Sequence, residues 1–358
     1  MSRFHTLTVS DIRRTTADCS VITLDVPDDK HAEFRFDPGQ YLTLRADVNG
    51  EDLRRSYSLC SSPLDKQWSV AIKQIEGGRF STFANQDLAI GDTLEVMPPM
   101  GQFTLEVDPD QARHYIGFAA GSGITPILSI IKTHLSEEPN STFKLFYVNR
   151  RVSSIILKEE LEALKNIFLD RLEIFYFLTQ EQRDIPLFNG RIDQQKLQIL
   201  FKVLCPLEFV DHCFICGPKD MIFMVRDEMQ AEGFKPEHIH YELFYSGDDD
   251  KAAPKPKPRK QLLSTDGIQV TLVDGGKELH FAMPDGEESI LDAALGTGAD
   301  LPYACKAGVC STCKCKVLEG TVDMRINYAL EADEVANNYV LSCQAYPTSD
   351  IIKVDFDV

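Results

Sequence analysis

Four cysteines close to the C-terminus constrain the fold of this chain more than any other feature of its sequence. Cys305, Cys310 and Cys313 are separated by four and two residues, and Cys343 follows after 29 more. This is the plant-type spacing of a [2Fe-2S] site, in which four thiolates converge on two irons, and it differs from the bacterial C-x2-C-x2-C-x3-C-P run. Zinc sites usually pair two short C-x2-C knuckles, and only one is present here. The spacing therefore predicts a [2Fe-2S] cluster held by these four cysteines.

The other six of the ten cysteines show no such grouping. We interpret Cys315, two residues past Cys313, as a bystander. The sequence has no apolar leader and no uncharged apolar run of the roughly 18 to 20 residues that span a bilayer. We therefore expect a cytoplasmic protein with free thiols and no membrane partner.

The rhythm of apolar residues predicts three domains and a linker. Short runs that alternate apolar and polar residues, with turns at Pro38-Gly39 and Asn49-Gly50, predict an antiparallel β-barrel. Apolar strands that alternate with helical stretches come next and predict a parallel α/β domain. A stretch rich in Pro and Lys, without an apolar face, then predicts an extended linker. The predicted boundaries are 1–110 for the barrel, 111–245 for the α/β domain, 246–261 for the linker and 262–358 for the cysteine-containing domain.

The balance of charge restricts the class of partner. The 358 residues carry a formal net charge of -18, and binding to a phosphate backbone depends on clustered Lys and Arg, so we expect no nucleic acid partner. From residue 263 onward, six Lys and Arg are outnumbered by sixteen Asp and Glu. Such an acidic surface is typical of a domain that steers a basic partner, and equally typical of a surface that only keeps a domain soluble.

Two loops in the α/β domain have the composition of a nucleotide-binding site. G-S-G-I-T-P at residues 121–126 follows an apolar strand and opens a helical stretch, so its glycines let a pyrophosphate approach helix N–H groups. The motif ends in Pro and departs from the Rossmann G-x-G-x-x-G, and alone it is equally typical of a plain strand-to-helix turn. C-G-P at residues 216–218 follows a later strand, and the carboxyl ends of parallel strands share the edge at which ligands bind.

Two segments of the barrel supply what a flavin diphosphate requires. R-S-Y-S at residues 55–58 offers charge, an aromatic ring and hydroxyls, and residues 73–82 place a Gly-Gly turn before a helix. Each residue separately is typical of a turn or a surface ion pair. Their order ahead of a nucleotide loop favours a flavin site, and the helix after the turn favours FAD over FMN.

The chain resembles the ferredoxin-NADP reductase superfamily fused to a plant-type ferredoxin. The motifs that carry the resemblance are, in order, R-x-Y-S, G-G-R-F-S, G-S-G-I-T-P, C-G-P and the four-cysteine run. The resemblance covers essentially the whole chain and implies a multidomain α+β fold whose last domain is β-grasp-like. It implies catalytic positions at Ser58, Cys216 and Phe244. It implies flavin contacts at Arg55, Tyr57, Ser58, Lys73, Gly78, Arg79, Ser81 and Thr82, and nucleotide contacts at Gly121, Gly123, Thr125, Pro126, Cys216, Gly217 and Pro218.

The chemistry of these cofactors predicts an NAD(P)H-dependent oxidoreductase. Hydride carries two electrons at once whereas an iron-sulfur cluster accepts one, so FAD is the converter between them. Arg150 and Arg151 follow the second strand of the α/β domain, where their guanidinium groups could bind a 2′-phosphate. No acidic residue stands at that strand end to accept a hydrogen bond from a 2′-hydroxyl. NADPH is therefore favoured over NADH, although two exposed arginines are also ordinary surface.

Within this superfamily, the chain most closely resembles the reductase subunits of phenylacetyl-CoA epoxidase complexes. The resemblance rests on the sequences L-R-R-x-Y-S, I-E-G-G-R-F-S and L-P-Y-A-C-K-x-G-V-C-x-T-C-K-C-K-V. That resemblance implies a separate di-iron oxygenase as the protein electron acceptor, in aerobic phenylacetate degradation, and no contact between this chain and phenylacetyl-CoA. The alternatives left open are a reductase for a ring-hydroxylating oxygenase or a hybrid-cluster protein, and a redox sensor or electron carrier without turnover.

Overall fold

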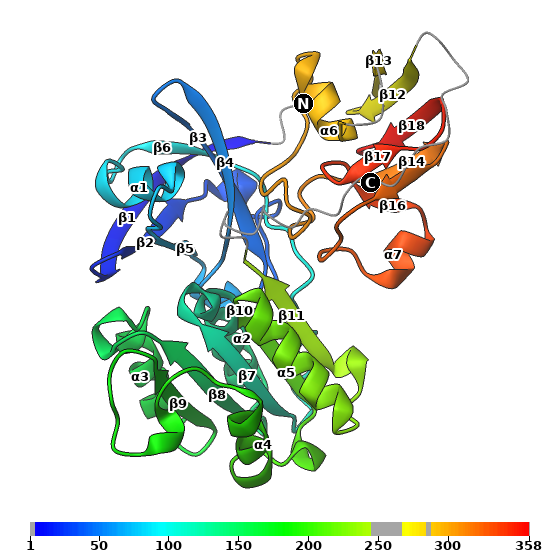
Figure 1. Cartoon of the computed structure of the whole chain (residues 1–358). Helices are drawn as coiled ribbons and strands as arrows, with labels where there is room; N and C mark the ends of the chain where they lie inside the picture. The colour runs from blue at the N-terminus through cyan, green and yellow to red at the C-terminus, as the bar shows by residue number, and fades with distance from the viewer. Residues whose placement is uncertain (1–3, 245–266, 284–287, 358) are drawn as a thin grey trace. The chain divides into compact units, whose positions relative to one another are not determined.

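The computed structural model describes residues 4–244, 267–283 and 288–357. They form two compact units, one spanning Phe4–Phe244 and the other lying within Tyr245–Val358 (Figure 1). The first unit contains both the predicted barrel and the predicted α/β domain. The predicted linker at 246–261 lies outside the described residues. No helix in the described ranges combines the length and the apolar character needed to cross a bilayer.

The first half of this unit is a six-stranded antiparallel sheet in the order β4-β3-β6-β1-β2-β5. A bridge between Leu59 and Val70 joins the β4 end to the β5 edge, so the sheet closes into the predicted barrel. In the hairpin between β3 and β4, Asn49 and Gly50 have φ of 57° and 80°, as a tight turn requires. The elements are β1 (His5–Thr16), β2 (Cys19–Asp25), β3 (Tyr41–Val48), β4 (Glu51–Ser58), β5 (Trp68–Lys73), α1 (Arg79–Gln86) and β6 (Thr93–Val96).

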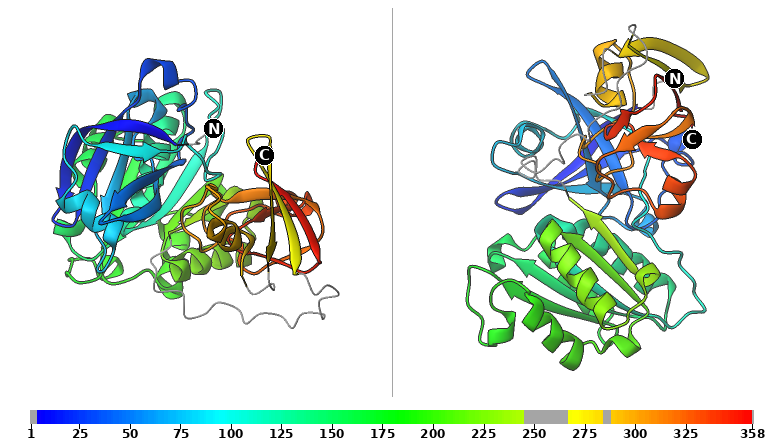
Figure 2. Two further views of the ribbon diagram at one scale, coloured as in Figure 1. Left: turned by 90° about the horizontal axis from the view of Figure 1, so that it is seen from above. Right: turned by 45° about the vertical axis from the view of Figure 1, so that its right-hand side comes forward.

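A five-stranded parallel sheet in the order β11-β10-β7-β8-β9 forms the second half. β10 lies beside β7, so the order of the strands reverses there, and ligands of open parallel sheets bind at the carboxyl ends of such strands. Residues of α2 and α3 share one hydrophobic core, whereas α4 and α5 pack against each other (Figure 2). The elements are β7 (His114–Ala120), α2 (Ile124–Glu137), β8 (Thr142–Asn149), α3 (Lys158–Ile167), β9 (Leu172–Leu178), α4 (Gln194–Val203), β10 (His212–Gly217), α5 (Lys219–Ala231) and β11 (Ile239–Leu243).

Buried hydroxyl groups fix the barrel to α2. Ser129 Oγ donates to the carbonyl oxygen of Ser61 at 2.6 Å, and the hydroxyls of Ser62 and Thr133 are 2.8 Å apart. All four side chains are buried. Because a buried polar group is costly to leave without a partner, these bonds hold the two halves in one arrangement.

The second unit is built on a mixed five-stranded sheet in the order β13-β12-β18-β14-β16, with a further two-stranded sheet of β15 and β17. β12 pairs in parallel with β18 and antiparallel with β13, and the apolar side of α6 lies in the core of the unit. The α+β class of the whole chain is thereby confirmed. The elements are β12 (Ile268–Asp274), β13 (Lys277–Met283), α6 (Ile290–Gly296), β14 (Lys314–Glu319), β15 (Val322–Met324), α7 (Ala332–Ala336), β16 (Tyr339–Leu341), β17 (Ala345–Pro347) and β18 (Ile351–Asp355).

A buried carboxylate follows the last residue of α2. Glu138 accepts hydrogen bonds from the hydroxyls of Tyr115 and Ser141, both at 2.7 Å, and lies 3.2 Å from nitrogen atoms of Arg113 and His134. Burial by itself raises the pKa of this carboxyl, but the hydrogen bonds from His134, Ser141 and Tyr115 overcome it and lower the pKa to about 2. The ionised form of Glu138 therefore stabilises the folded unit.

Glu138→Gln should lower the free energy of unfolding at pH 7 by about 3 kcal/mol, since each unit of pKa shift corresponds to about 1.4 kcal/mol. The stabilisation is complete above the ordinary pKa of 4.5 and is lost as the pH falls towards 2, so variant and wild type should converge in acid. Denaturant unfolding at neutral and at acid pH measures both effects. A difference that stays constant with pH would contradict the role given to the carboxylate.

Candidate functional site

The loop after β7 turns directly into a helix. Gly121–Gly123 form one 3-10 turn, and α2 begins at Ile124 with Gly123 as its N-cap residue. Thr125 and Pro126 lie buried in the first turn, and no side chain caps this helix. Its first N–H groups are therefore placed to bind an anion, as predicted for the pyrophosphate of a nucleotide.

The loop after β10 touches this turn backbone to backbone. A Cβ atom added to Gly123 would lie 2.1 Å from the carbonyl oxygen of Cys216 and 3.0 Å from the nitrogen of Gly217, so only glycine fits there. Pro218 then precedes α5 as its N-cap residue. Burial, and after it the neighbouring Glu242, raises the pKa of the Cys216 thiol well above its ordinary value. Cys216 is thus a neutral thiol that shapes the site and is no nucleophile.

Tyr147, in β8, supports the first loop. Its hydroxyl donates to the carbonyl oxygen of Gly121 at 2.9 Å, and it lies opposite Ala119 in the neighbouring strand. No pattern in the sequence marks this residue, because a tyrosine in an apolar strand is ordinarily part of a core. Only the register between β7 and β8 shows that its hydroxyl reaches the loop.

Ser58 and Glu242 join the barrel to the parallel sheet. Ser58 Oγ donates to Glu242 Oε2 at 2.9 Å, and Glu242 lies opposite Cys216 in the pairing of β11 with β10. Desolvation raises the pKa of Glu242 to about 7, and the hydrogen bond from Ser58 opposes the rise. Phe244, two residues further on, packs partly buried against the same core. The sequence pointed to Ser58, Cys216 and Phe244 but not to Glu242, although residues two apart share one face of a strand.

The predicted flavin contacts include an aromatic ring, a helix start and a guanidinium group. The ring of Tyr57 in β4 lies 5.7 Å from that of Phe80 in α1. Gly78 is the N-cap residue of α1, and no side chain caps this helix. Arg79, the first residue of α1, forms an ion pair with Glu51 at the start of β4. The end of β4 and the start of α1 therefore lie together, as a diphosphate with an attached ring system requires.

The remaining predicted flavin contacts each have a protein partner. Ser81 is buried, and its hydroxyl donates to the carbonyl oxygen of Gly78 at 3.1 Å, which shapes the turn before α1. The other partners are the carbonyl oxygen of Arg54 for Arg55, the amide of Gln74 for Thr82 and the carboxylate of Asp18 for Lys73.

The four predicted cluster ligands lie as two close pairs. The Sγ atoms of Cys305 and Cys310 are 3.1 Å apart, and a hydrogen bond with Cys343, followed by burial, raises the pKa of the Cys313 thiol. A [2Fe-2S] cluster has two irons with two thiolates on each. Two pairs of cysteines are the donor set that fits it.

Local backbone geometry shapes the loop of the first pair. Gly308 has a φ of 73°, and a Cβ added there would lie 2.7 Å from the carbonyl oxygen of Ile326. The N–H of Ala307 donates to Cys305 Sγ at 3.3 Å, a contact that stabilises a thiolate. Cys315 lies fully buried in the core of the second unit, and we retain its interpretation as a bystander.

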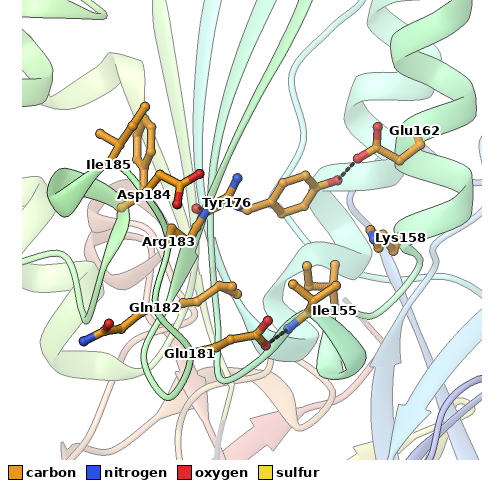
Figure 3. Close-up of a pocket in the computed structure, with 12 residues that line it drawn as sticks. Ile155, Lys158, Glu162, Tyr176, Glu181, Gln182, Arg183, Asp184 and Ile185 are labelled. Carbon is orange, nitrogen blue, oxygen red and sulfur yellow. Dashed lines mark hydrogen bonds between the residues drawn. The ribbon is translucent and has the colours of Figure 1, made fainter.

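A cavity of about 490 Å³ lies beside the ends of β8 and β9 (Figure 3). The hydroxyl of Tyr176 donates to Glu162 at 2.9 Å, and Glu181 accepts a hydrogen bond from the N–H of Val152, also at 2.9 Å. Lys158, Arg183 and Asp184 also line the cavity. Carboxylates and cations are thus both present where ligands of parallel sheets bind.

Arg150 and Arg151 immediately precede Val152 and are exposed, and they do not line this cavity. The end of β8 by itself carries no acidic residue. The folded sheet adds Glu181, which follows the neighbouring strand β9 and reaches the backbone next to Arg151. The preference for NADPH over NADH therefore stays a prediction.

Three family descriptions match the chain in the order of its predicted domains. An oxidoreductase FAD-binding domain matches residues 6–105, an oxidoreductase NAD-binding domain matches 118–227, and a 2Fe-2S iron-sulfur cluster binding domain matches 272–348. Together these matches define the class: a flavin- and nicotinamide-dependent oxidoreductase with its own 2Fe-2S domain.

The chain is 45% identical to a subunit of the 1,2-phenylacetyl-CoA epoxidase of Escherichia coli (strain K12), over 100% of this chain and 99% of that protein. It is 35% identical to the 3-ketosteroid-9-alpha-monooxygenase ferredoxin reductase component of Rhodococcus rhodochrous, over 99% of this chain and 97% of the relative. The solved structure of phthalate dioxygenase reductase has the same fold, with a TM-score of 0.59 at 24% identity over 99% of this chain and 98% of that one. The chain belongs to the family of oxygenase reductases that includes the matched component of 1,2-phenylacetyl-CoA epoxidase.

Gly123→Ala should weaken nucleotide binding, because the added Cβ meets the carbonyl group of Cys216 and forces the two loops apart. We expect the KM for the nicotinamide nucleotide to rise by about tenfold or more, while the flavin spectrum stays unchanged. Steady-state kinetics with each nucleotide measures the effect. Gly296→Ala is the control, since nothing lies within 4 Å of a Cβ added there. An unchanged KM in Gly123→Ala would show that the contact between the loops does not position the nucleotide.

Proposed function

We propose that this chain is the reductase component that passes electrons from a nicotinamide nucleotide, through FAD and a [2Fe-2S] cluster, to a separate di-iron oxygenase acting on phenylacetyl-CoA. The observation that carries the proposal is the 45% identity to a component of 1,2-phenylacetyl-CoA epoxidase over the whole chain, which includes all three cofactor domains. A second candidate acceptor is an oxygenase of the 3-ketosteroid-9-alpha-monooxygenase kind, supported by the 35% identity to its reductase component.

The barrel and the start of α1 are the proposed flavin site. The N–H groups after Gly78 and the guanidinium of Arg79 suit a diphosphate, and Tyr57 supplies a ring beside them. When bound, FAD supplies the conversion of a two-electron hydride into single electrons. The proposed contacts are Arg55, Tyr57, Ser58, Lys73, Gly78, Arg79, Ser81 and Thr82.

Hydride transfer is proposed to take place where the barrel meets the carboxyl edge of the sheet. Ser58 donates to Glu242 and so orients this carboxyl group, while the neutral thiol of Cys216 fills the space beside it. A carboxylate at this position stabilises the positive charge that a nicotinamide ring acquires as it gives up hydride. Phe244 is the proposed cover of the flavin ring. The proposed nucleotide contacts are Gly121, Gly123, Thr125, Pro126, Cys216, Gly217 and Pro218.

The [2Fe-2S] cluster is proposed to be held by two pairs of cysteines, Cys305 with Cys310 on one iron and Cys313 with Cys343 on the other. The 3.1 Å separation of the first two sulfur atoms and the contact between the last two support this division. The six cysteines outside this site form no disulfide, which agrees with a reducing compartment. We therefore also propose a cytoplasmic location, which cell fractionation tests.

NADPH is the proposed coenzyme and NADH the alternative. The cations near the end of β8 are the exposed Arg150 and Arg151 and, in the cavity, Lys158 and Arg183, and each suits a 2′-phosphate. Glu181 acts in the opposite sense, because a carboxylate repels a phosphate and accepts from a 2′-hydroxyl. The ratio of kcat/KM for the two nucleotides decides between them.

Cys310→Ser should lose the iron of the cluster and keep flavin reduction, because the flavin site belongs to the other unit. The variant should bleach its flavin with NADPH under anaerobic conditions but should not support turnover by the purified oxygenase. Iron analysis, absorbance and coupled turnover measure the three properties. Cys315→Ser is the matched control and should keep its iron. Unchanged iron in Cys310→Ser would refute the ligand assignment, and a wild-type flavin that neither nucleotide bleaches would refute the reductase.

The rate of flavin reduction should rise with pH through about 7, because Glu242 ionises there and its carboxylate stabilises the oxidised nicotinamide. Glu242→Gln should remove this rise and slow the reaction by about tenfold, which corresponds to about 1.4 kcal/mol. Anaerobic stopped-flow absorbance at a series of pH values measures the rate. Glu237→Gln, an exposed glutamate shortly before the same strand, is the control. The same pH dependence in wild type and Glu242→Gln would exclude Glu242 as its source.

A further inference from the structure

Lys306, directly after Cys305, has a backbone conformation that residues other than glycine rarely adopt. Its φ is 53°, in the left-handed region. Such a residue persists only where its surroundings hold it, and such strain is concentrated at functional sites. Three contacts hold Lys306, one at its carbonyl group and two at its ammonium group.

The contact at the carbonyl group joins two parts of the cysteine site. Gln344 Nε2 donates to the carbonyl oxygen of Lys306 at 2.9 Å. Gln344 directly follows Cys343 and is only 8% exposed. The bond therefore ties the loop that carries Cys305 to the segment that carries Cys343, and it fixes Lys306 relative to both.

The contacts at the ammonium group hold a positive charge at the surface beside this loop. Lys306 Nζ lies 2.8 Å from Asp292 Oδ1 and 4.8 Å from the centre of the Tyr303 ring. Asp292 is held in turn, because its other oxygen accepts from the hydroxyl of Ser289 at 2.8 Å. The side chains of Lys306 and Asp292 are 42% and 49% exposed, so neither charge is removed by burial.

The same arrangement recurs at the second pair of cysteines. Lys314 directly follows Cys313, pairs with Glu334 at 3.1 Å and lies 5.3 Å from the centre of the Tyr339 ring. In each cysteine pair, the first member is thus followed by a lysine that contacts both a carboxylate and a tyrosine. This repetition occurs in a domain whose acidic residues outnumber its basic ones by sixteen to six from residue 263 onward.

We propose that the pairs Lys306–Asp292 and Lys314–Glu334 set the reduction potential of the [2Fe-2S] cluster, with each lysine raising it and each carboxylate lowering it. The inference rests on the proposed function, since it requires the four cysteines to be the ligands. Reduction adds one electron to a centre whose thiolates and sulfides already outweigh the charge of its two ferric irons. A nearby cation therefore favours the reduced form, and a nearby carboxylate favours the oxidised form.

The test replaces each member of each ion pair, in turn, by a neutral residue in the full-length holoprotein. Spectroelectrochemistry then measures the midpoint potential of the cluster. Lys306→Gln and Lys314→Gln should lower the potential, whereas Asp292→Asn and Glu334→Gln should raise it. We expect each shift to be roughly threefold in the one-electron equilibrium constant, about 28 mV at 59 mV per tenfold change. Lys306→Arg keeps the charge and should keep the potential.

Lys353→Gln is the control, because Lys353 is also paired, with Glu278 at 2.7 Å, but lies opposite Glu319 in β14. Glu319 is five residues beyond Lys314, roughly 17 Å along the strand. A purely structural role predicts that both members of a pair shift the potential in the same direction, and that result, or no shift, overturns the proposal. Iron content is measured first, since a wild-type protein that binds no iron would refute the ligand assignment instead.

Discussion

The arrangement of the first unit depends on the backbone contact between Gly123 and Cys216. Because no Cβ fits between them, the turn after β7 and the end of β10 approach as closely as two backbones can. The strand register then places Ala119, Cys216 and Glu242 in one row across β7, β10 and β11. Ser58 reaches the end of that row from the barrel. The close contact thus lies where side chains of four distant segments meet.

The same close packing sets the protonation of the site. Removing water from this row disfavours charge, so the Cys216 thiol stays neutral and the pKa of Glu242 rises to about 7. The cysteine site of the second unit follows the opposite rule. There the charges of Lys306 and Lys314 lie partly in solvent and are balanced by carboxylates rather than by burial. Desolvation thus controls the charge of Cys216 and Glu242, whereas pairing with carboxylates balances the charges of the two lysines.

The features that sequence analysis found are those encoded within a few neighbouring residues. The spacing of the cysteines, the glycine turn at 121–123 and the strand rhythm predicted the domains and most of the candidate site. Glu242, Tyr147 and Glu181 could not be found in this way, because each contacts a residue of another element, far away in the sequence. Ser58 and Glu242, for example, are 184 positions apart in the chain. The packing of one sheet against the other, which no local pattern encodes, decides such contacts.

The last strand of the second unit lies in the middle of its sheet. β18 is hydrogen-bonded between β12 and β14, so the sheet cannot close until the chain through Asp355 has left the ribosome. All four cysteines of the cluster site are synthesised before that point. The segment that carries all four thiols is therefore made before the strand that completes the sheet, and the sheet closes around a cysteine loop whose sequence is already in place.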